Sequence, residues 1–299
     1  MLAKISKPGL RCGLVLAIIG ILIFGCVSLT RMLSAQPPTQ GVVSTKVSPK
    51  DSMVQMYVPA GEFLMGTTEE QWDALIQRAD YLSWGSEEPQ HPVYLDAFWI
   101  DQTEVTNAQF VRCVASGQCT KPRDNFYTWP SYFRDSRVAD YPVILVDWNQ
   151  AQTYCAWADR RLPSEAEWEK AARGPGGRIY PWGDAEPNQY LLNYHNYIGD
   201  TTAVGSYPSG ASFYGALDMA GNVWEWVNDW YSLTYYQSYL PTNPNPTGPD
   251  SGTYRVLRGG SWGDDAVYYV HSALRFYNTP DLQDYYQDLR IGFRCAASP

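Results

Sequence analysis

The feature that most limits how this chain can fold is the scarcity of regular structure in its second half. After Gly174 the sequence shows almost no helical periodicity, and turn-rich stretches recur at residues 178–183, 205–214 and 241–252. The chain has 24 glycines and 21 prolines among 299 residues, which predicts many turns and few long helices. An irregular chain of this length needs internal cross-links, namely disulfides, bound ions or buried polar networks.

Composition excludes two classes of protein. The 12 tryptophans, 23 tyrosines and 9 phenylalanines exclude a disordered chain, which would lack such rings. The 22 basic residues against 31 acidic ones give a net charge of −9. A nucleic-acid-binding surface needs the opposite sign, so we expect no nucleic-acid partner.

The first 35 residues form a segment of a different kind. Residues 12–30 carry no charge, and they follow Lys4, Lys7 and Arg11 and precede Arg31. Nineteen uncharged residues reach the lower limit for a membrane-spanning helix, and the basic excess on the N-terminal side places the remainder outside the membrane. The sequence therefore predicts a signal or transmembrane anchor over residues 1–35.

Two other fates of this segment stay open, namely cleavage after Ala35 and a lipoprotein linkage at Cys26. All three export the rest of the chain. Residues 36–299 hold 18 basic and 31 acidic residues, so the exported part carries −13. Residues 36–52 lack aromatic side chains and periodicity, which predicts a flexible linker before a single folded domain at 53–299.

Export also determines how the cysteines are interpreted. Cys113, Cys119, Cys155 and Cys295 lie in the exported part, where four thiols predict two disulfides with three possible connectivities. Cys113 and Cys119 are close enough for a local loop, and this pairing would leave Cys155 with Cys295. A metal site is the alternative, but a C-x₅-C pair without a nearby histidine is a poor zinc pattern.

The body of the domain shows short strands, turns and three helices. We expect strands at 54–58 and 63–65 in a hairpin-like arrangement and a further strand at 93–100. Capping residues predict the helices, which begin after Thr106, Asp147 and Ser164 and extend over 107–115, 148–158 and up to Arg173.

An ordered series of motifs carries a family resemblance. It comprises PAGEF (59–63) with MG (65–66), Asp101 with EVTN (104–107), PV (142–143) with VDW (146–148), RLPSEAEWE (161–169), PWG (181–183), GNVWEW (221–226), RGGSW (258–262), NTPD (278–281) and GFRC (292–295). This series resembles the formylglycine-generating enzyme (sulfatase-modifying factor) family over about residues 54–297. The resemblance implies an irregular α+β fold related to C-type lectins, with little regular secondary structure.

The resemblance also implies a chemistry that this chain lacks. The founding enzymes bind copper through two cysteines after the Arg-Gly-Gly-Ser segment and oxidise a sulfatase cysteine to formylglycine. Asp264 and Tyr269 stand at those positions here, and residues 261–278 contain no cysteine. Neither replacement is a soft thiolate ligand for copper. Ser261 is retained, whereas a substrate-contacting asparagine of the family corresponds to Arg290, so we do not expect copper-dependent formylglycine formation.

A second group in the family consists of iron enzymes that join sulfur to histidine derivatives. This chain has three histidines, His91, His195 and His271, and lacks the family's added helical domain. A site of two histidines and a carboxylate nevertheless stays open as an alternative. The stretch that corresponds to the family's catalytic loop has two interpretations. The simpler one is that its polar residues are solvated loop residues. The other is a polar cleft for a ligand, which would contain Ser261, Asp264, Asp265, His271, Arg275 and Arg290.

Structural calcium is the cofactor that the resemblance implies. Carboxylates and backbone carbonyls on irregular loops suit a hard cation that takes six to eight oxygens. The alternative at the first of two sites is that Glu225 pairs with an arginine. The implied ligands are Asp218, Gly221, Val223 and Glu225 at the first site, and Asn193, Tyr194 and Asp200 at the second.

The resemblance agrees with a Cys155–Cys295 bridge, and it leaves three functions to weigh. The first is an exported, membrane-tethered, non-catalytic binding or accessory module, whose partner would be an unknown peptide, glycan or envelope protein. The second is a metal-dependent oxidoreductase, either formylglycine-forming or iron-dependent. The third is a structural component of an envelope complex.

Overall fold

The structure is a computed structural model that describes residues 44–76, 86–123, 132–238, 243–265, 267–282 and 290–299. These residues belong to one compact unit, Gln40–Pro299. The anchor predicted at 1–35 lies outside the described residues. Within the described ranges, no helix is both long and apolar enough to cross a membrane.

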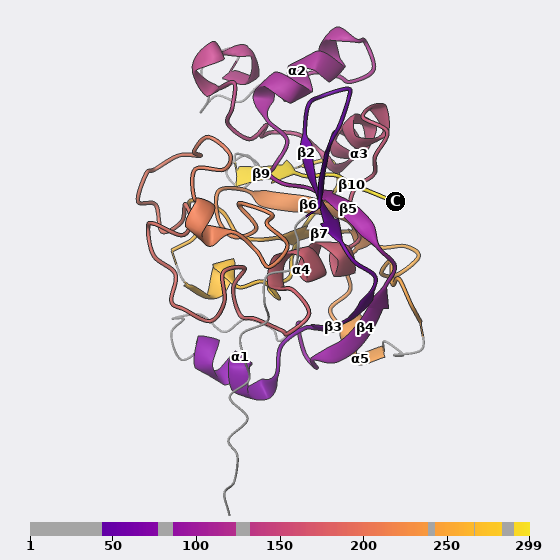
Figure 1. Ribbon diagram of the computed structural model, residues 1–299, viewed down its shortest axis with the longest axis vertical. Helices are drawn as coiled ribbons and strands as arrows, with labels where there is room; N and C mark the ends of the chain where they lie inside the picture. Colours follow the sequence, from indigo (N-terminus) through magenta and orange to yellow (C-terminus); the bar gives the residue numbers. More distant parts are fainter. Residues whose placement is uncertain (1–43, 77–85, 124–131, 239–242, 266, 283–289) are drawn as a thin grey trace, which may run out of the picture. The chain divides into compact units, whose positions relative to one another are not determined.

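Short elements separated by long loops make up the fold, as the sequence predicts (Figure 1). In chain order they are β1 (Thr45–Val47), β2 (Val54–Val58), β3 (Gly61–Met65), α1 (Glu69–Ile76), β4 (His91–Leu95), β5 (Phe98–Asp101), α2 (Asn107–Ala115), η1 (Tyr132–Arg134), η2 (Ser136–Val138), α3 (Trp148–Trp157), α4 (Glu165–Arg173), η3 (Pro208–Gly210), β6 (Trp224–Trp230), α5 (Tyr235–Ser238), β7 (Arg255–Arg258), η4 (Val267–Val270), β8 (Phe276–Asn278), β9 (Ile291–Phe293) and β10 (Ala296–Ala297).

The first strands form a bent antiparallel ribbon rather than the predicted hairpin. β2 pairs with β5 and β3 pairs with β4, and the register continues unchanged from one pair to the next. The ribbon is interrupted where Pro59 and Ala60 lie opposite Asp96 and Ala97, because proline cannot donate a ladder hydrogen bond. The strand predicted at 93–100 is therefore two strands, which Figure 1 shows in two differently oriented sheets.

The folded domain begins before residue 53, so the predicted linker over 36–52 is wrong in its second part. β1 pairs with β2 in an antiparallel ladder. Asp51 is buried, and its carboxylate accepts hydrogen bonds from Arg160 and from the Tyr154 hydroxyl, the latter at 2.8 Å. This pairing and burial attach residues 45–52 to the core.

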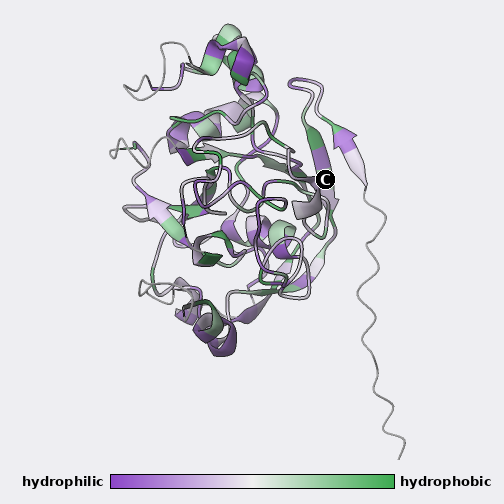
Figure 2. Cartoon of the chain, turned by 90° about the vertical axis from the view of Figure 1, so that its left-hand side faces the viewer, coloured by the Kyte–Doolittle hydropathy of each residue, from purple (hydrophilic) through white to green (hydrophobic). Residues whose placement is uncertain are grey.

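The helices agree better with the sequence than the strands do. α2 and α4 have the predicted bounds, and α3 ends one residue early, at Trp157. A capping box starts each of these three helices. α1 is absent from the prediction; its exposed acidic residues make it mostly hydrophilic, as Figure 2 shows at the lower end of the domain.

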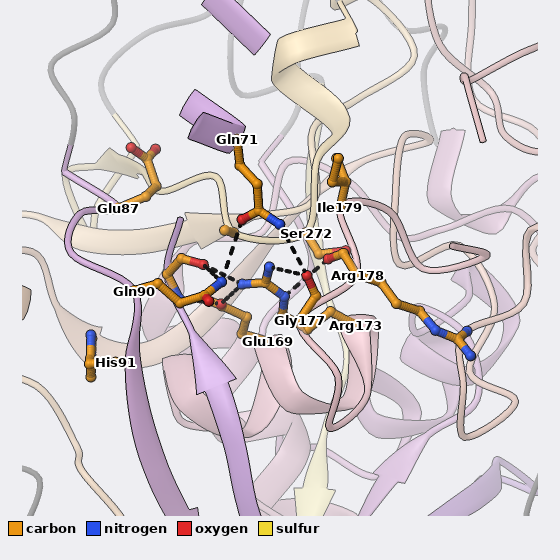
Figure 3. A network of polar contacts seen from close by, with 12 residues as sticks. Gln71, Glu87, Gln90, His91, Glu169, Arg173, Gly177, Arg178, Ile179 and Ser272 are labelled. Carbon is orange, nitrogen blue, oxygen red and sulfur yellow. Dashed lines mark hydrogen bonds and ion pairs between the residues drawn. The ribbon is translucent and has the colours of Figure 1, made fainter. Parts of the chain in front are cut away.

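Disulfides and buried ion pairs connect the elements, as the irregular sequence requires. Cys113 is bonded to Cys119 and Cys155 to Cys295. The carboxylate of Glu169, on α4, contacts Arg173 and Arg258 at 2.8 and 2.5 Å, and all three side chains are buried. Figure 3 shows the Arg173 guanidinium at the centre of this network, between α4 and neighbouring loops.

The strand order β8-β7-β6-β9 defines the sheet that carries the site described below. β6 pairs in parallel with β9 and antiparallel with β7, and β8 forms one edge. The two large apolar clusters of the core both receive side chains from β6 and β7.

Candidate functional site

A cleft of about 250 Å³ opens beside the β8-β7-β6-β9 sheet. Side chains from these strands form its floor, and the loop that follows β7 forms one wall. Its lining residues are Trp224, Leu257, Gly263, Asp264, Asp265, Tyr269, Phe276, Arg290 and Ile291.

The wall depends on two glycines after Arg258. Gly259 and Gly260 adopt φ values of 95° and 75°, which L side chains rarely take. A Cβ atom at Gly260 would lie 2.4 Å from the Tyr269 carbonyl oxygen. This close approach at Gly260 brings Tyr269, another lining residue, beside the loop.

Ser261 holds the Asp264 side chain in place. One carboxylate oxygen of Asp264 accepts hydrogen bonds from the Ser261 backbone N–H at 2.7 Å and from its hydroxyl at 2.8 Å. The other oxygen faces Arg290 at 3.6 Å. Burial raises the pKa of Asp264, and the hydrogen bonds of Ser261 and the charge of Arg290 oppose that rise.

The floor of the cleft is aromatic. Trp224 and Phe276 stack with ring centroids 5.0 Å apart and an interplanar angle of 29°. Tyr269 adds a third ring to the lining, and Asp264, Asp265 and Arg290 add charged groups. Sites for small ligands commonly combine aromatic side chains with a few polar groups that orient the ligand.

A neighbouring loop supports the wall from behind. The His195 backbone N–H donates to the Asp264 carbonyl at 2.9 Å, and the His195 ring contacts the Asp265 carbonyl at 2.6 Å. Asn196 donates to the Trp262 carbonyl at 2.8 Å. His195 therefore has a structural contact with the cleft wall and does not line the cleft.

Two of the residues predicted for the cleft lie elsewhere. His271 is buried with its Nδ1 2.5 Å from the Tyr268 carbonyl, and burial lowers its pKa to about 4. Arg275 forms an ion pair with Glu165 at 2.7 Å inside the network around α4. Both belong to the core, which corrects the prediction, whereas Asp264, Asp265 and Arg290 come together with Tyr269.

The first predicted calcium site contains an arginine. Both carboxylate oxygens of Glu225 accept hydrogen bonds from Arg294 at 2.7 Å, and one also accepts from the Trp168 indole. This is the ion pair that the sequence left open as the alternative. Asp218 is buried, and one of its oxygens accepts from the Gly205 N–H at 2.6 Å.

Glu104 is a buried acid near Asp218 and Glu225, and sequence reasoning did not select it as a site residue. Burial and then the charges of Asp218 and Glu225 raise its pKa well above the usual value. One of its oxygens accepts a hydrogen bond from Asn222 at 3.0 Å. Its only local signal was the Glu-Val-Thr-Asn motif, which does not indicate whether the glutamate is buried.

The second predicted calcium site retains an oxygen that no protein donor engages. Asn193 is buried; its amide nitrogen donates to the Asp200 carbonyl at 2.9 Å, while its Oδ1 has no hydrogen-bond partner. Buried amide oxygens of this kind are ligands for calcium. Asn193 Oδ1 is therefore available to a hard cation at this second site.

A transition-metal centre finds no support in the ranges that the structure describes. No three histidine, cysteine or acidic side chains converge there to hold a metal ion. His91, His195 and His271 each contact a different backbone carbonyl.

Comparison with known proteins decides the family. Residues 39–299 match the sulfatase-modifying factor enzyme 1-like domain. The formylglycine-generating enzyme of Streptomyces coelicolor is 35% identical over 301 residues, covering 83% of this chain and 90% of that protein. The chain belongs to the sulfatase-modifying factor family.

Other similar proteins carry different names. The serine/threonine-protein kinase Pkn1 of Chlamydia trachomatis is 37% identical over 292 residues, covering 90% of this chain but 42% of that protein. The chain thus spans about two fifths of the length of the chlamydial relatives it matches. PvdO from Pseudomonas aeruginosa has a TM-score of 0.67 at 26% identity and covers 86% of this chain and 98% of its own.

Membership confirms the fold expected from the motifs. The described residues form an irregular domain of helices and strands, and a C-type-lectin-related fold is consistent with the sulfatase-modifying factor neighbours. Asp264 and Tyr269, the two residues that the motif resemblance expects at cysteine positions, both line the cleft.

Proposed function

We propose that this chain is an exported, membrane-tethered sulfatase-modifying factor domain that acts as a non-catalytic binding or accessory module. The observation that carries the proposal is the cleft, which has an acidic and a phenolic side chain where the resemblance expects two thiols. Carboxylate and phenol are poor ligands for Cu(I). In the described part of the chain every cysteine is in a disulfide.

A direct assay tests the absence of copper chemistry. The full chain is incubated with copper, oxygen and a Cys-x-Pro-x-Arg peptide, and the peptide mass is followed. We expect no change. A mass decrease that matches conversion of the thiol to an aldehyde would contradict the non-catalytic function, and a known formylglycine-generating enzyme serves as the positive control.

An iron-dependent oxidoreductase is the alternative, because the hercynine oxygenase of Mycolicibacterium smegmatis is 35% identical over 237 residues, covering 69% of this chain and 53% of that protein. Elemental analysis of the purified chain separates the two proposals. Stoichiometric iron or copper would favour the oxidoreductase, whereas calcium alone would favour the binding module.

The tether is proposed from the uncharged segment at 12–30 and from the two disulfides, which form in oxidising compartments. Membrane fractionation of the full chain and of a variant that lacks residues 1–35 tests it. We expect only the full chain in the membrane fraction, and equal distribution of both would contradict tethering.

We also propose structural calcium at the Asn193 site. Calcium should raise the melting temperature of chain stripped with EGTA, because a ligand that binds only the folded state stabilises it. Asn193→Leu should abolish this dependence, whereas Asp218→Asn tests the first site separately. An unchanged melting temperature on calcium addition to the parent chain would remove the proposal.

A further inference from the structure

The charges around the cleft suggest the class of ligand that it takes. We propose that the cleft binds a free α-amino acid with a large apolar side chain. Its carboxylate would contact Arg290, its ammonium group would contact Asp264 and Asp265, and its side chain would pack on Trp224 and Phe276. The inference rests on the proposed non-catalytic binding function and specifies its ligand.

Arg290 supplies the position for the carboxylate. In the part of the lining that the structure describes it is the one cation, and a quarter of its side chain is exposed. Its nitrogen lies 3.6 Å from Asp264, beyond the roughly 2.7–2.9 Å of a charge-assisted hydrogen bond. A guanidinium has five N–H donors and binds a carboxylate through two of them, so Arg290 retains the capacity for an anionic ligand.

Asp264 and Asp265 supply the position for the ammonium group of the ligand. Asp264 is fixed by Ser261 with one oxygen directed toward Arg290, and Asp265 is exposed at the rim. Among the described residues that line the cleft, one side chain is thus positive and two are negative. A simple carboxylate would meet both aspartates, and a simple amine would meet Arg290, whereas a zwitterion places each of its charges against an opposite one.

Size and apolar surface restrict the rest of the ligand. Drug-sized ligands occupy pockets of roughly 300–1,000 Å³, and the cleft is smaller, at about 250 Å³. The Trp224 and Phe276 rings, which stack on one another, line the cleft together with Leu257 and Ile291, so the groups available to a ligand side chain at the floor are apolar. A single amino acid with an aromatic or large aliphatic side chain matches both properties.

Isothermal titration calorimetry of the full-length chain tests this assignment with three probes. L-phenylalanine carries both charges, 3-phenylpropionate lacks the ammonium group, and 2-phenylethylamine lacks the carboxylate. We expect L-phenylalanine to bind at least about tenfold more tightly than either analogue, because each analogue leaves one charged position without its partner.

Variants of Arg290 and Asp265 then test which charged group of the ligand each residue contacts. Arg290→Gln should weaken L-phenylalanine and 3-phenylpropionate by about tenfold or more but not 2-phenylethylamine, and Arg290→Lys should be intermediate because it keeps charge without the planar fork. Asp265→Asn should weaken the two probes that carry ammonium. Arg137→Gln is the matched control, since Arg137 is an exposed arginine that pairs with Asp135 at 2.6 Å and does not line the cleft.

Two results would overturn the inference. One is the absence of L-phenylalanine binding at about 10 mM, where even millimolar affinity is measurable. The other is binding that Arg290→Gln leaves unchanged. Either result leaves the non-catalytic function intact, because that function fails only in the copper and peptide assay or in the metal analysis.

Discussion

At the scale of single residues, Glu169 contributes most to holding the irregular chain together. Its carboxylate accepts from the Gly66 N–H at 2.7 Å and pairs with Arg173 and Arg258, and none of these groups reaches solvent. Glu169→Gln leaves the buried Arg173 guanidinium without its charge partner and leaves Arg258 paired with Glu165 alone. We expect it to lower the free energy of unfolding by about 3–5 kcal/mol, measured by urea denaturation.

An exposed pair provides the matched control. Lys50 and Asp159 lie 2.9 Å apart with side chains 39% and 72% exposed. Asp159→Asn should cost less than about 1 kcal/mol, because solvent screens such pairs. If Glu169→Gln costs no more than Asp159→Asn, the buried network does not act as an internal cross-link.

Glu87 should make stability depend on pH. It is fully buried, and burial raises its pKa from 4.5 to about 7, while the Arg275 backbone N–H opposes the rise. Between these values the folded state holds a proton that the unfolded state has lost, so stability falls as pH rises from about 4.5 to 7. Glu87→Gln should remove a loss of about 3 kcal/mol from that window. Identical pH profiles for both proteins would contradict this assignment.

At the scale of elements, the helix starts depend on a few local atoms. The Ser164 hydroxyl accepts from the Glu167 N–H at 3.1 Å, and the Glu167 carboxylate accepts from the Ser164 N–H at 2.8 Å. Ser164→Ala should lower stability by about 1 kcal/mol in thermal or chemical denaturation. Thr153→Ala, at an exposed position within α3, should change it by less than about 0.5 kcal/mol; an equal effect of both would argue against the cap.

This locality explains which elements the sequence predicted. The caps at Thr106, Asp147 and Ser164 lie within three residues of their partners, so the helices were found almost to the residue. The partner of β2 is β5, some forty residues away, and no local pattern shows that pairing. The predicted hairpin failed because adjacency in sequence was taken for adjacency in the sheet.

In the candidate site too, contacts between residues close in sequence could be predicted, whereas contacts between distant residues could not. Ser261 and Asp264 contact one another across a turn of three residues, and the motif identified both. His271 and Arg275 lie only a few residues further along, but 3-10 helix η4 and the turn after it direct them into the core. The aromatic floor of Trp224 and Phe276 joins β6 to β8, which only the folded sheet reveals.

At the scale of the molecule, the two disulfides constrain the chain to different degrees. Cys155 and Cys295 are 140 residues apart, against 6 for Cys113 and Cys119. Because a longer closed loop restricts the unfolded chain more, the pair Cys155→Ala and Cys295→Ala should cost about 5 kcal/mol and the pair Cys113→Ala and Cys119→Ala about 2 kcal/mol. Denaturation of both double variants measures the difference, and equal losses would contradict the loop-length explanation.

The position of the last strand also determines when the first sheet can form. β10 pairs with β5, and the Cys295 N–H donates to the Asp101 carboxylate across 194 residues. The ribosome synthesises β10 only after the long stretch of chain that separates it from β5. The sheet that contains β1, β2 and β5 is therefore completed only once β10 has been synthesised, and the nascent chain must stay unaggregated until then.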